Sequence, residues 1–182
     1  THTSQSKPLI NYNENKVEKG EAERIYFNGI DEFSDRNRVI SEFSFATKAS
    51  KRKDNYVHIS LNFTSEDFEK LDQEKVIEIA NFYLKELGFP DEQLKIIYRH
   101  FDTKHPHIHI VIPKIVNGKA LTETTNFKKS MMITRKIEKE FGLSITEKGK
   151  QSKEDYSIQT VNDFIQNENP SKTEKIKAFN SK

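Results

Sequence analysis

Four of the six histidines in this chain of 182 residues lie within one stretch, from His100 to His109. Imidazole is a common ligand of divalent transition metals, so such crowding indicates metal chemistry. Side chains alternate between the two faces of a strand, so His107 and His109 project from the same face. If the segment Leu94 to Phe101 pairs with that strand, His100 reaches the same face from the neighbouring strand. The spacing therefore predicts a cup of three imidazoles.

Three neutral imidazoles leave coordination positions open, as in catalytic rather than closed structural metal sites. Surface imidazoles on a half-exposed strand are the alternative. His105 has the same parity but precedes Pro106 at a turn, which makes it a weaker candidate ligand. Asp102 is a candidate for orienting a ligand through its second N–H, or for acting as a base. His58 lies in an earlier strand and either faces the same cleft or is structural.

The motifs around these residues resemble a known family. HFDTKHPHIHIVI is similar to the third motif of the mobilisation relaxases, HUH-class endonucleases of bacterial plasmids and mobilisable transposons. NYNENKV, with Tyr12, occupies the place of the family's N-terminal motif. YVHISLNF and the following TSED match the middle motif more loosely. The resemblance covers roughly residues 8 to 115 and is most specific at the histidines.

This resemblance implies that His100, His107 and His109 bind the metal and that Tyr12 attacks a DNA phosphate. The implied reaction is strand-specific nicking at an origin of transfer, which gives a 5′-phosphotyrosyl adduct and a free 3′-OH. The implied cofactor is a divalent ion, Mn or Mg in the cell, with Zn, Ni or Co as alternatives. The implied partners are single-stranded origin DNA, relaxosome accessory proteins and a coupling protein.

The attacking tyrosine needs activation, because a phenol has a pKa of about 10. Asp102 and His58 are the candidate bases. Tyr26 is a rival nucleophile, but it lies in an apolar cluster with Ile25 and Phe27 and is more typical of a core residue.

The elements that must position these residues predict an α+β fold, a central antiparallel sheet flanked by helices, as the resemblance also implies. Pro8 to Ile10 followed by NYNENKV is interpreted as a strand end and a turn. Ile40 to Ala46 is interpreted as a short helix, and Tyr56 to Phe63 as a strand. Thr64 is a candidate N-cap for a helix ending near Leu87, before Gly88.

Leu94 to Phe101 and Pro106 to Ile115 predict an antiparallel hairpin. Asn117-Gly118 predicts a tight turn, with a further strand through Ala120 and Leu121. A second helix is expected from Phe127 to Phe141, and a weak helix at Ile158, Val161 and Ile165. We expect a nuclease domain over residues 1–150 and a polar extension over 151–182, and the length leaves open that the chain is a fragment of a longer protein.

Composition narrows the chemistry further. The chain has no Cys, so thiolate ligands are excluded, and its formal net charge is only +2, so any attraction to DNA must be local. Candidate phosphate contacts are Lys48, Lys51, Arg52 and Lys53, with Arg99, Lys104 and Lys114 flanking the histidine strands. With no long apolar run and no signal sequence, we expect a cytoplasmic bacterial protein without membrane insertion.

Three other functions remain open from the sequence. A rolling-circle replication initiator of the HUH class carries its tyrosine after the histidine motif, where Tyr156 is the main candidate. An unrelated three-histidine hydrolase or oxygenase leaves NYNENKV unexplained. A non-enzymatic DNA-binding module makes the histidine cluster incidental.

Overall fold

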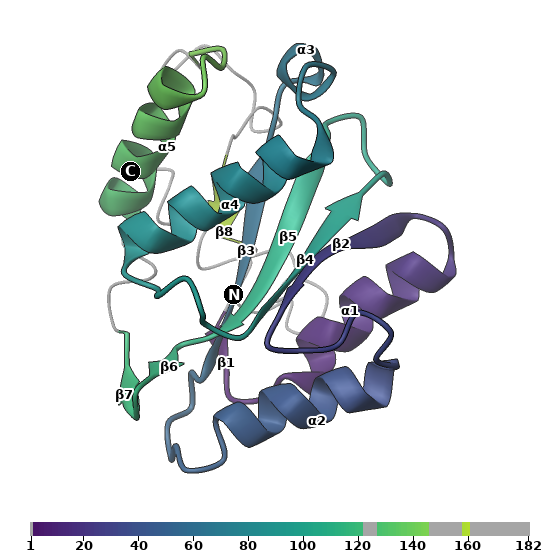
Figure 1. Cartoon of the computed structure of the whole chain (residues 1–182), viewed down its shortest axis with the longest axis vertical. Helices are drawn as coiled ribbons and strands as arrows, with labels where there is room; N and C mark the ends of the chain where they lie inside the picture. Colours follow the sequence, from purple (N-terminus) through teal and green to yellow (C-terminus); the bar gives the residue numbers. More distant parts are fainter. Residues whose placement is uncertain (1, 122–126, 146–157, 161–182) are drawn as a thin grey trace, which may run out of the picture.

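The computed structural model describes residues 2–121, 127–145 and 158–160 (Figure 1). Its helices are α1 (Lys7–Glu18), α2 (Arg36–Ala46), α3 (Ser65–Phe68), α4 (Gln73–Leu87) and α5 (Phe127–Glu140). Its strands are β1 (His2–Thr3), β2 (Ala22–Asn28), β3 (Tyr56–Asn62), β4 (Lys95–His100), β5 (His107–Pro113), β6 (Ile115–Val116), β7 (Lys119–Ala120) and β8 (Ile158–Thr160).

The main sheet is antiparallel, with strand order β1-β3-β5-β4-β2, and β8 also pairs with β3. The two histidine strands, β4 and β5, form the predicted hairpin and lie inside the sheet, flanked by β2 and β3. With helices on both sides, this is the expected α+β fold, and the prediction of a central antiparallel sheet is confirmed.

The two faces of the sheet carry different cores. On one face, apolar residues such as Ile59, Ile97 and Ile110 join the buried side chains of α4 and α5. On the other face, Ile96 and Val111 pack with residues of α1 and α2. Because neighbours along a strand point to opposite faces, the strand histidines share the α1 side of the sheet with these residues. Helix α1 therefore lies over the histidines.

The segment around Tyr12 is a helix, so the prediction of a strand end followed by a turn is wrong. Helix α1 has Pro8 in its first turn, where a fixed φ suits a helix and the missing N–H is not needed. Its buried residues are Leu9, Ile10, Asn13 and Glu14. This spacing defines one helical face. Its burial against the sheet overrides the poor helix propensity of the asparagines.

The region from Thr64 to Leu87 contains two helices rather than one. Thr64 is an N-cap, as predicted, and accepts a hydrogen bond from the backbone N–H of Asp67, but it begins the short α3. Asp72 then caps α4 by accepting the backbone N–H of Lys75. The first turn of every helix has backbone N–H groups without a partner in the helix. Asp72 accepts from one of these groups and so favours the start of a new helix. Gly88 ends α4 with a φ of 101°, as expected.

The strand predicted after the Asn117-Gly118 turn is present, but it pairs elsewhere. Both turn residues have positive φ, 49° and 75°, as a tight hairpin requires. Strand β7 pairs with β6 in a separate two-stranded sheet rather than alongside β5. The predicted helix from Phe127 to Phe141 is confirmed as α5.

The helix predicted around Ile158 is contradicted, because residues 158–160 form β8 and pair with β3. A free edge of β3 supplies unpaired backbone groups, and these override a weak helical pattern. Val161, Ile165 and Tyr156 lie outside the described residues, and the boundary at residue 150 stays a prediction. Among the described helices, none is long and apolar enough to cross a membrane.

Candidate metal centre and nucleophile

The register of β4 and β5 brings the three predicted histidines together. His100 and His107 are direct partners across the hairpin, and His109 follows on the same face. The ring centroids of His100 and His109 are 4.2 Å apart, and those of His107 and His109 are 5.0 Å apart. One ring nitrogen from each histidine lies within 4.8 Å of the others. The predicted shared face is therefore present.

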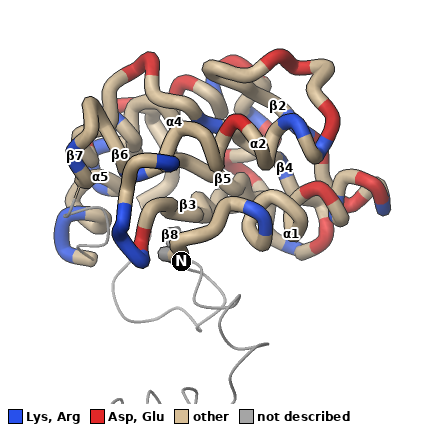
Figure 2. Tube along the Cα trace, turned by 90° about the horizontal axis from the view of Figure 1, so that it is seen from below, with Lys and Arg blue, Asp and Glu red and all other residues tan. Residues whose placement is uncertain are grey.

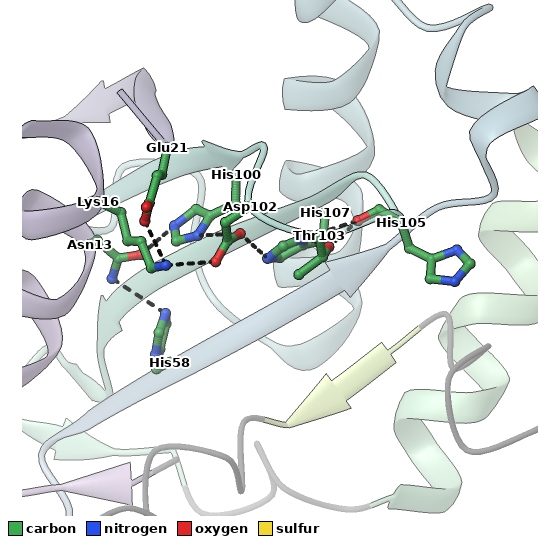
Figure 3. Close-up of polar contacts among 9 residues, drawn as sticks. All are labelled: Asn13, Lys16, Glu21, His58, His100, Asp102, Thr103, His105 and His107. Carbon is green, nitrogen blue, oxygen red and sulfur yellow. Dashed lines mark hydrogen bonds and ion pairs between the residues drawn. The ribbon is translucent and has the colours of Figure 1, made fainter. Parts of the chain in front are cut away.

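Hydrogen bonds orient two of these rings (Figure 3). His107 donates from Nδ1 to the backbone carbonyl of His105 over 3.1 Å, which leaves its Nε2 available. His100 donates from Nε2 to the side-chain oxygen of Asn13 over 2.9 Å, which leaves its Nδ1 available. Metal-binding histidines are commonly held in this way, with one nitrogen in a hydrogen bond and the other toward the ion.

The donor set fits a metal ion. Within the described part of the chain, Nδ1 of His100 and Nδ1 of His109 are buried and lack a hydrogen-bond partner. Buried nitrogens without a hydrogen-bond partner are uncommon in proteins, and a bound ion or water would satisfy them. Three buried imidazoles with available nitrogens suit a divalent transition metal. With only three protein ligands, such a site is typical of an open catalytic centre rather than of a closed structural one.

Burial also keeps the imidazoles neutral. It lowers the pKa of His58 and of His109 well below the ordinary value, and it lowers the pKa of His107. Burial, together with the neighbouring His107, lowers the pKa of His100 from 6.5 to about 4. Neutral rings can bind a metal at weakly acidic pH without first releasing a proton.

These lowered pKa values predict an acid-sensitive fold. In the unfolded chain the imidazoles take up protons below a pH of about 6.5, whereas in the folded chain they stay neutral. Metal-free protein should thus be most stable above that pH and lose roughly 1.4 kcal/mol per pH unit for each buried imidazole below it. Urea unfolding in EDTA at three pH values between 7.5 and 5 measures this. A midpoint that does not move with pH would contradict the burial of neutral imidazoles.

Tyr12 lies beside the histidine cluster. Its ring centroid is 6.0 Å from that of His100, in a stacked arrangement, and 5.9 Å from that of His109. It is 6.0 Å from the ring of His58, which faces the same cluster, 4.6 Å from the ring of His109. The predicted nucleophile and one candidate base are thus neighbours of the predicted ligands.

Asp102 lies between two histidines, but it does not accept from their second N–H groups as an orienting carboxylate would. Its Oδ1 is 3.7 Å from Nδ1 of His100 and 3.8 Å from Nε2 of His107, too far for hydrogen bonds. These are the nitrogens left available, whereas the second N–H groups go to Asn13 and His105. Asp102 therefore faces the interior of the cup instead of supporting it from behind.

A lysine from α1 holds Asp102 in place. Nζ of Lys16 lies 2.8 Å from Oδ2 of Asp102 and 2.7 Å from Oε2 of Glu21 (Figure 3). Burial acts to raise the pKa of Asp102, but the hydrogen bond and charge of Lys16 hold it below its usual value. The same two carboxylates raise the pKa of Lys16. Asp102 is therefore a carboxylate at neutral pH.

The candidate DNA contacts are not in one place. Lys51, Arg52 and Lys53 precede β3, whose far end pairs with His107, so this loop lies at the opposite end of the sheet. Arg99 is adjacent to His100 in β4 and points to the other face, where it stacks on Phe68 at 4.7 Å. Lys104 is exposed on the loop between the histidine strands.

The remaining basic candidates and rival site residues lie away from the cup. Nζ of Lys114 is buried and lies 2.8 Å from Oδ2 of Asp54. Lys48 is exposed just after α2. The ring of His105 points away from the other imidazoles (Figure 3). Tyr26 is part of β2 and packs against the α4 core, as expected for a core residue.

Charge is interspersed over the rest of the molecule. Figure 2 shows Lys and Arg scattered among Asp and Glu along the trace seen from below. This agrees with a formal net charge of +2 and with a local rather than global attraction to nucleic acid.

A comparison with protein families decides the class. The family model described as Relaxase: MobA/VirD2-like, nuclease domain, matches residues 12–143. The chain belongs to this family. The relaxase match begins at Tyr12 and includes the whole histidine motif, and it supports a relaxase nuclease over the other functions left open. No curated protein and no solved structure gives a significant match.

The sequence does not predict that Asn13 and Lys16 contact the site of this relaxase domain. Both contact the predicted site residues, and both belong to α1. Because NYNENKV is interpreted as a turn, no shared face is expected for Tyr12, Asn13 and Lys16. A helix places positions 12, 13 and 16 on one side, and Pro8 followed by two apolar residues was the available signal.

Proposed function

We propose that this relaxase domain nicks single-stranded DNA at an origin of transfer, with Tyr12 as the nucleophile. The observation that carries the proposal is the position of the Tyr12 ring, about 6 Å from the rings of His100 and His109. A nucleophile beside three available imidazoles suits attack on a phosphate held at the cup. The product would be a 5′-phosphotyrosyl adduct, consistent with mobilisation of a plasmid or transposon in the bacterial cytoplasm.

His100, His107 and His109 would hold a divalent ion. Such an ion supplies positive charge for the non-bridging phosphate oxygens as negative charge builds up in the transition state. The orienting groups, Asn13 and the carbonyl of His105, keep two of the imidazoles directed into the cup. We propose Mn or Mg as the ion bound in the cell, and imidazoles also accept Zn, Ni or Co.

The reaction would be a transesterification. The Tyr12 oxygen bonds to phosphorus, the bond from phosphorus to the 3′ oxygen breaks, and the 3′ oxygen leaves as a hydroxyl after taking a proton. The phenol proton goes to a base, and we favour His58 over Asp102 because the ring centroid of His58 lies 6.0 Å from that of Tyr12. The covalent adduct keeps the energy of the broken bond, so the strand can be rejoined without a nucleotide.

Incubation with labelled single-stranded oligonucleotides that tile the origin of transfer, in the presence of Mn²⁺, tests the proposal. We expect one oligonucleotide to give a band that carries both DNA and protein on a denaturing gel, together with a shorter product that ends in 3′-OH. EDTA should abolish both products. An intact oligonucleotide throughout the tiled set would count against nicking, and cleavage without a covalent adduct would count against Tyr12.

We propose that DNA near the nick contacts Lys104 and not Lys51. Of these two lysines, only Lys104 lies on the loop that joins the histidine strands. Lys104→Ala should weaken binding of a short oligonucleotide that spans the nick. The slope of log affinity against log salt should fall by about 0.7, the value for one phosphate contact on a single strand. Fluorescence anisotropy over a salt series measures this slope.

Lys51→Ala is the matched control for this prediction. Because Lys51 is at the other end of the sheet, its loss should leave short-oligonucleotide binding unchanged and affect only longer DNA. An equal loss of short-oligonucleotide affinity in both variants would contradict the proposal that DNA near the nick contacts the Lys104 loop. Accessory proteins and a coupling protein remain proposed partners for the full assembly.

A further inference from the structure

Asn13 contacts two of the clustered histidines at once. Its side-chain oxygen accepts from Nε2 of His100 over 2.9 Å, and its amide nitrogen lies 3.4 Å from Nε2 of His58 (Figure 3). The same nitrogen donates to the backbone carbonyl of Leu9 over 2.8 Å. Asn13 is fully buried, so these contacts are made without competition from water. A single amide therefore bridges α1 and two strands of the sheet.

The orientation of this amide is fixed by α1 itself. Oxygen and nitrogen of an asparagine are assigned from their hydrogen-bond partners. If the amide were reversed, its oxygen would face the carbonyl oxygen of Leu9 at 2.8 Å, and two acceptors would oppose each other. The nitrogen must therefore face Leu9, and the oxygen must face His100. An acceptor at that position requires a hydrogen on Nε2 of His100.

We infer that Asn13 is a positioning residue that fixes the tautomer of His100 and so directs its Nδ1 into the cup. The inference rests on the proposed metal site for its purpose, but not for its geometry. With the hydrogen on Nε2, the lone pair of His100 is on Nδ1, the buried atom that lacks a hydrogen-bond partner in the described structure. His107 has the opposite arrangement, with Nδ1 donating to the carbonyl of His105.

This role joins the nucleophile to the cup through one helix. Tyr12 and Asn13 are consecutive in α1, so the residue that orients a ligand also fixes the turn that carries the phenol. A shift of α1 would move the tyrosine and release the His100 ring together. Loss of a group that orients a ligand in this way typically weakens metal binding by about 10- to 100-fold.

Nuclear magnetic resonance of the metal-free protein tests the tautomer directly. Long-range proton–nitrogen correlation spectra of protein with ¹⁵N-labelled histidine, recorded at pH 8, distinguish Nε2–H from Nδ1–H. We expect His100 to carry its hydrogen on Nε2 and His107 to carry it on Nδ1. A hydrogen on Nδ1 of His100 in the wild-type protein would overturn the inference, whatever its metal binding or nicking activity.

Variants then test the effect on metal binding. Asn13→Leu should mix the two tautomers of His100 and weaken Mn²⁺ binding about 10- to 100-fold by calorimetry, as for other losses of an orienting partner. Asn13→Asp keeps an acceptor for Nε2–H and should keep the tautomer of His100, but its second oxygen would face the carbonyl of Leu9, so the free energy of unfolding should fall. Asn11→Leu, the matched change earlier in α1, should alter neither measurement. Unchanged Mn²⁺ affinity in a folded Asn13→Leu variant would contradict the inference, whereas a wild-type protein that binds no metal would contradict only the proposed function.

Discussion

Tyr12→Phe should abolish the denaturation-resistant DNA–protein adduct and lower the nicking rate by at least about 10³-fold, the scale on which removal of a nucleophile acts. The change removes one oxygen atom and keeps the ring that stacks on His100. The helix and the metal affinity should therefore be preserved. Denaturing gels measure the adduct, and calorimetry with Mn²⁺ shows whether the cup is intact.

Tyr26→Phe is the matched control because it removes the same oxygen from a tyrosine on β2. Tyr26 packs against the α4 core and has no place at the cup, so the variant should nick at the wild-type rate. A persistent adduct in Tyr12→Phe, or the loss of the adduct in Tyr26→Phe, would move the nucleophile away from α1.

The histidine cup was predictable because two simple periodicities determine it. Strand alternation places His107 and His109 on one face, and the short connection between two apolar segments predicts the hairpin that adds His100. The structure has this hairpin, with His100 opposite His107. Both features, strand alternation and a short hairpin connection, involve residues close together in the chain, so the sequence pattern is enough to predict them.

The support around the cup was not predictable in the same way. Asn13 and His100 are far apart in the chain, and their contact depends on how α1 packs on the sheet. Lys16 reaches Asp102 for the same reason. No periodicity within a strand or a helix states which polar side chains meet across two layers. Asp102 accordingly faces the available nitrogens rather than the N–H groups from which an orienting carboxylate would accept.

The error at α1 had the largest functional consequence. Asn-rich segments favour turns because asparagine side chains compete with the backbone for hydrogen bonds. In the structure these side chains have other partners, since Asn13 bonds to Leu9 and His100, and Asn15 accepts from Arg36. Helix formation here depends on tertiary contacts. The motif is therefore better understood as a helical platform that presents Tyr12 to the cup.

His107→Ala should weaken Mn²⁺ binding by more than about 100-fold, because loss of a group that merely orients a ligand already weakens binding 10- to 100-fold. Nε2 of His107 is one of the available nitrogens of the cup, and two imidazoles alone hold a divalent ion poorly. Nicking should fall with metal occupancy. Calorimetry measures the metal affinity, the gel assay measures nicking, and circular dichroism checks that the variant protein is folded.

The sharpest control lies two residues earlier, in the loop that leads to β5. His105→Ala removes an imidazole that points away from the cup, and it keeps the backbone carbonyl that accepts from His107. Metal affinity and nicking should thus match the wild-type protein. Both substitutions are His→Ala beside Pro106, so their difference isolates the direction of the ring from the chemistry of the residue. Equal effects would show that the density of histidines, rather than their shared strand face, is what binds metal, and the cup would no longer explain the site.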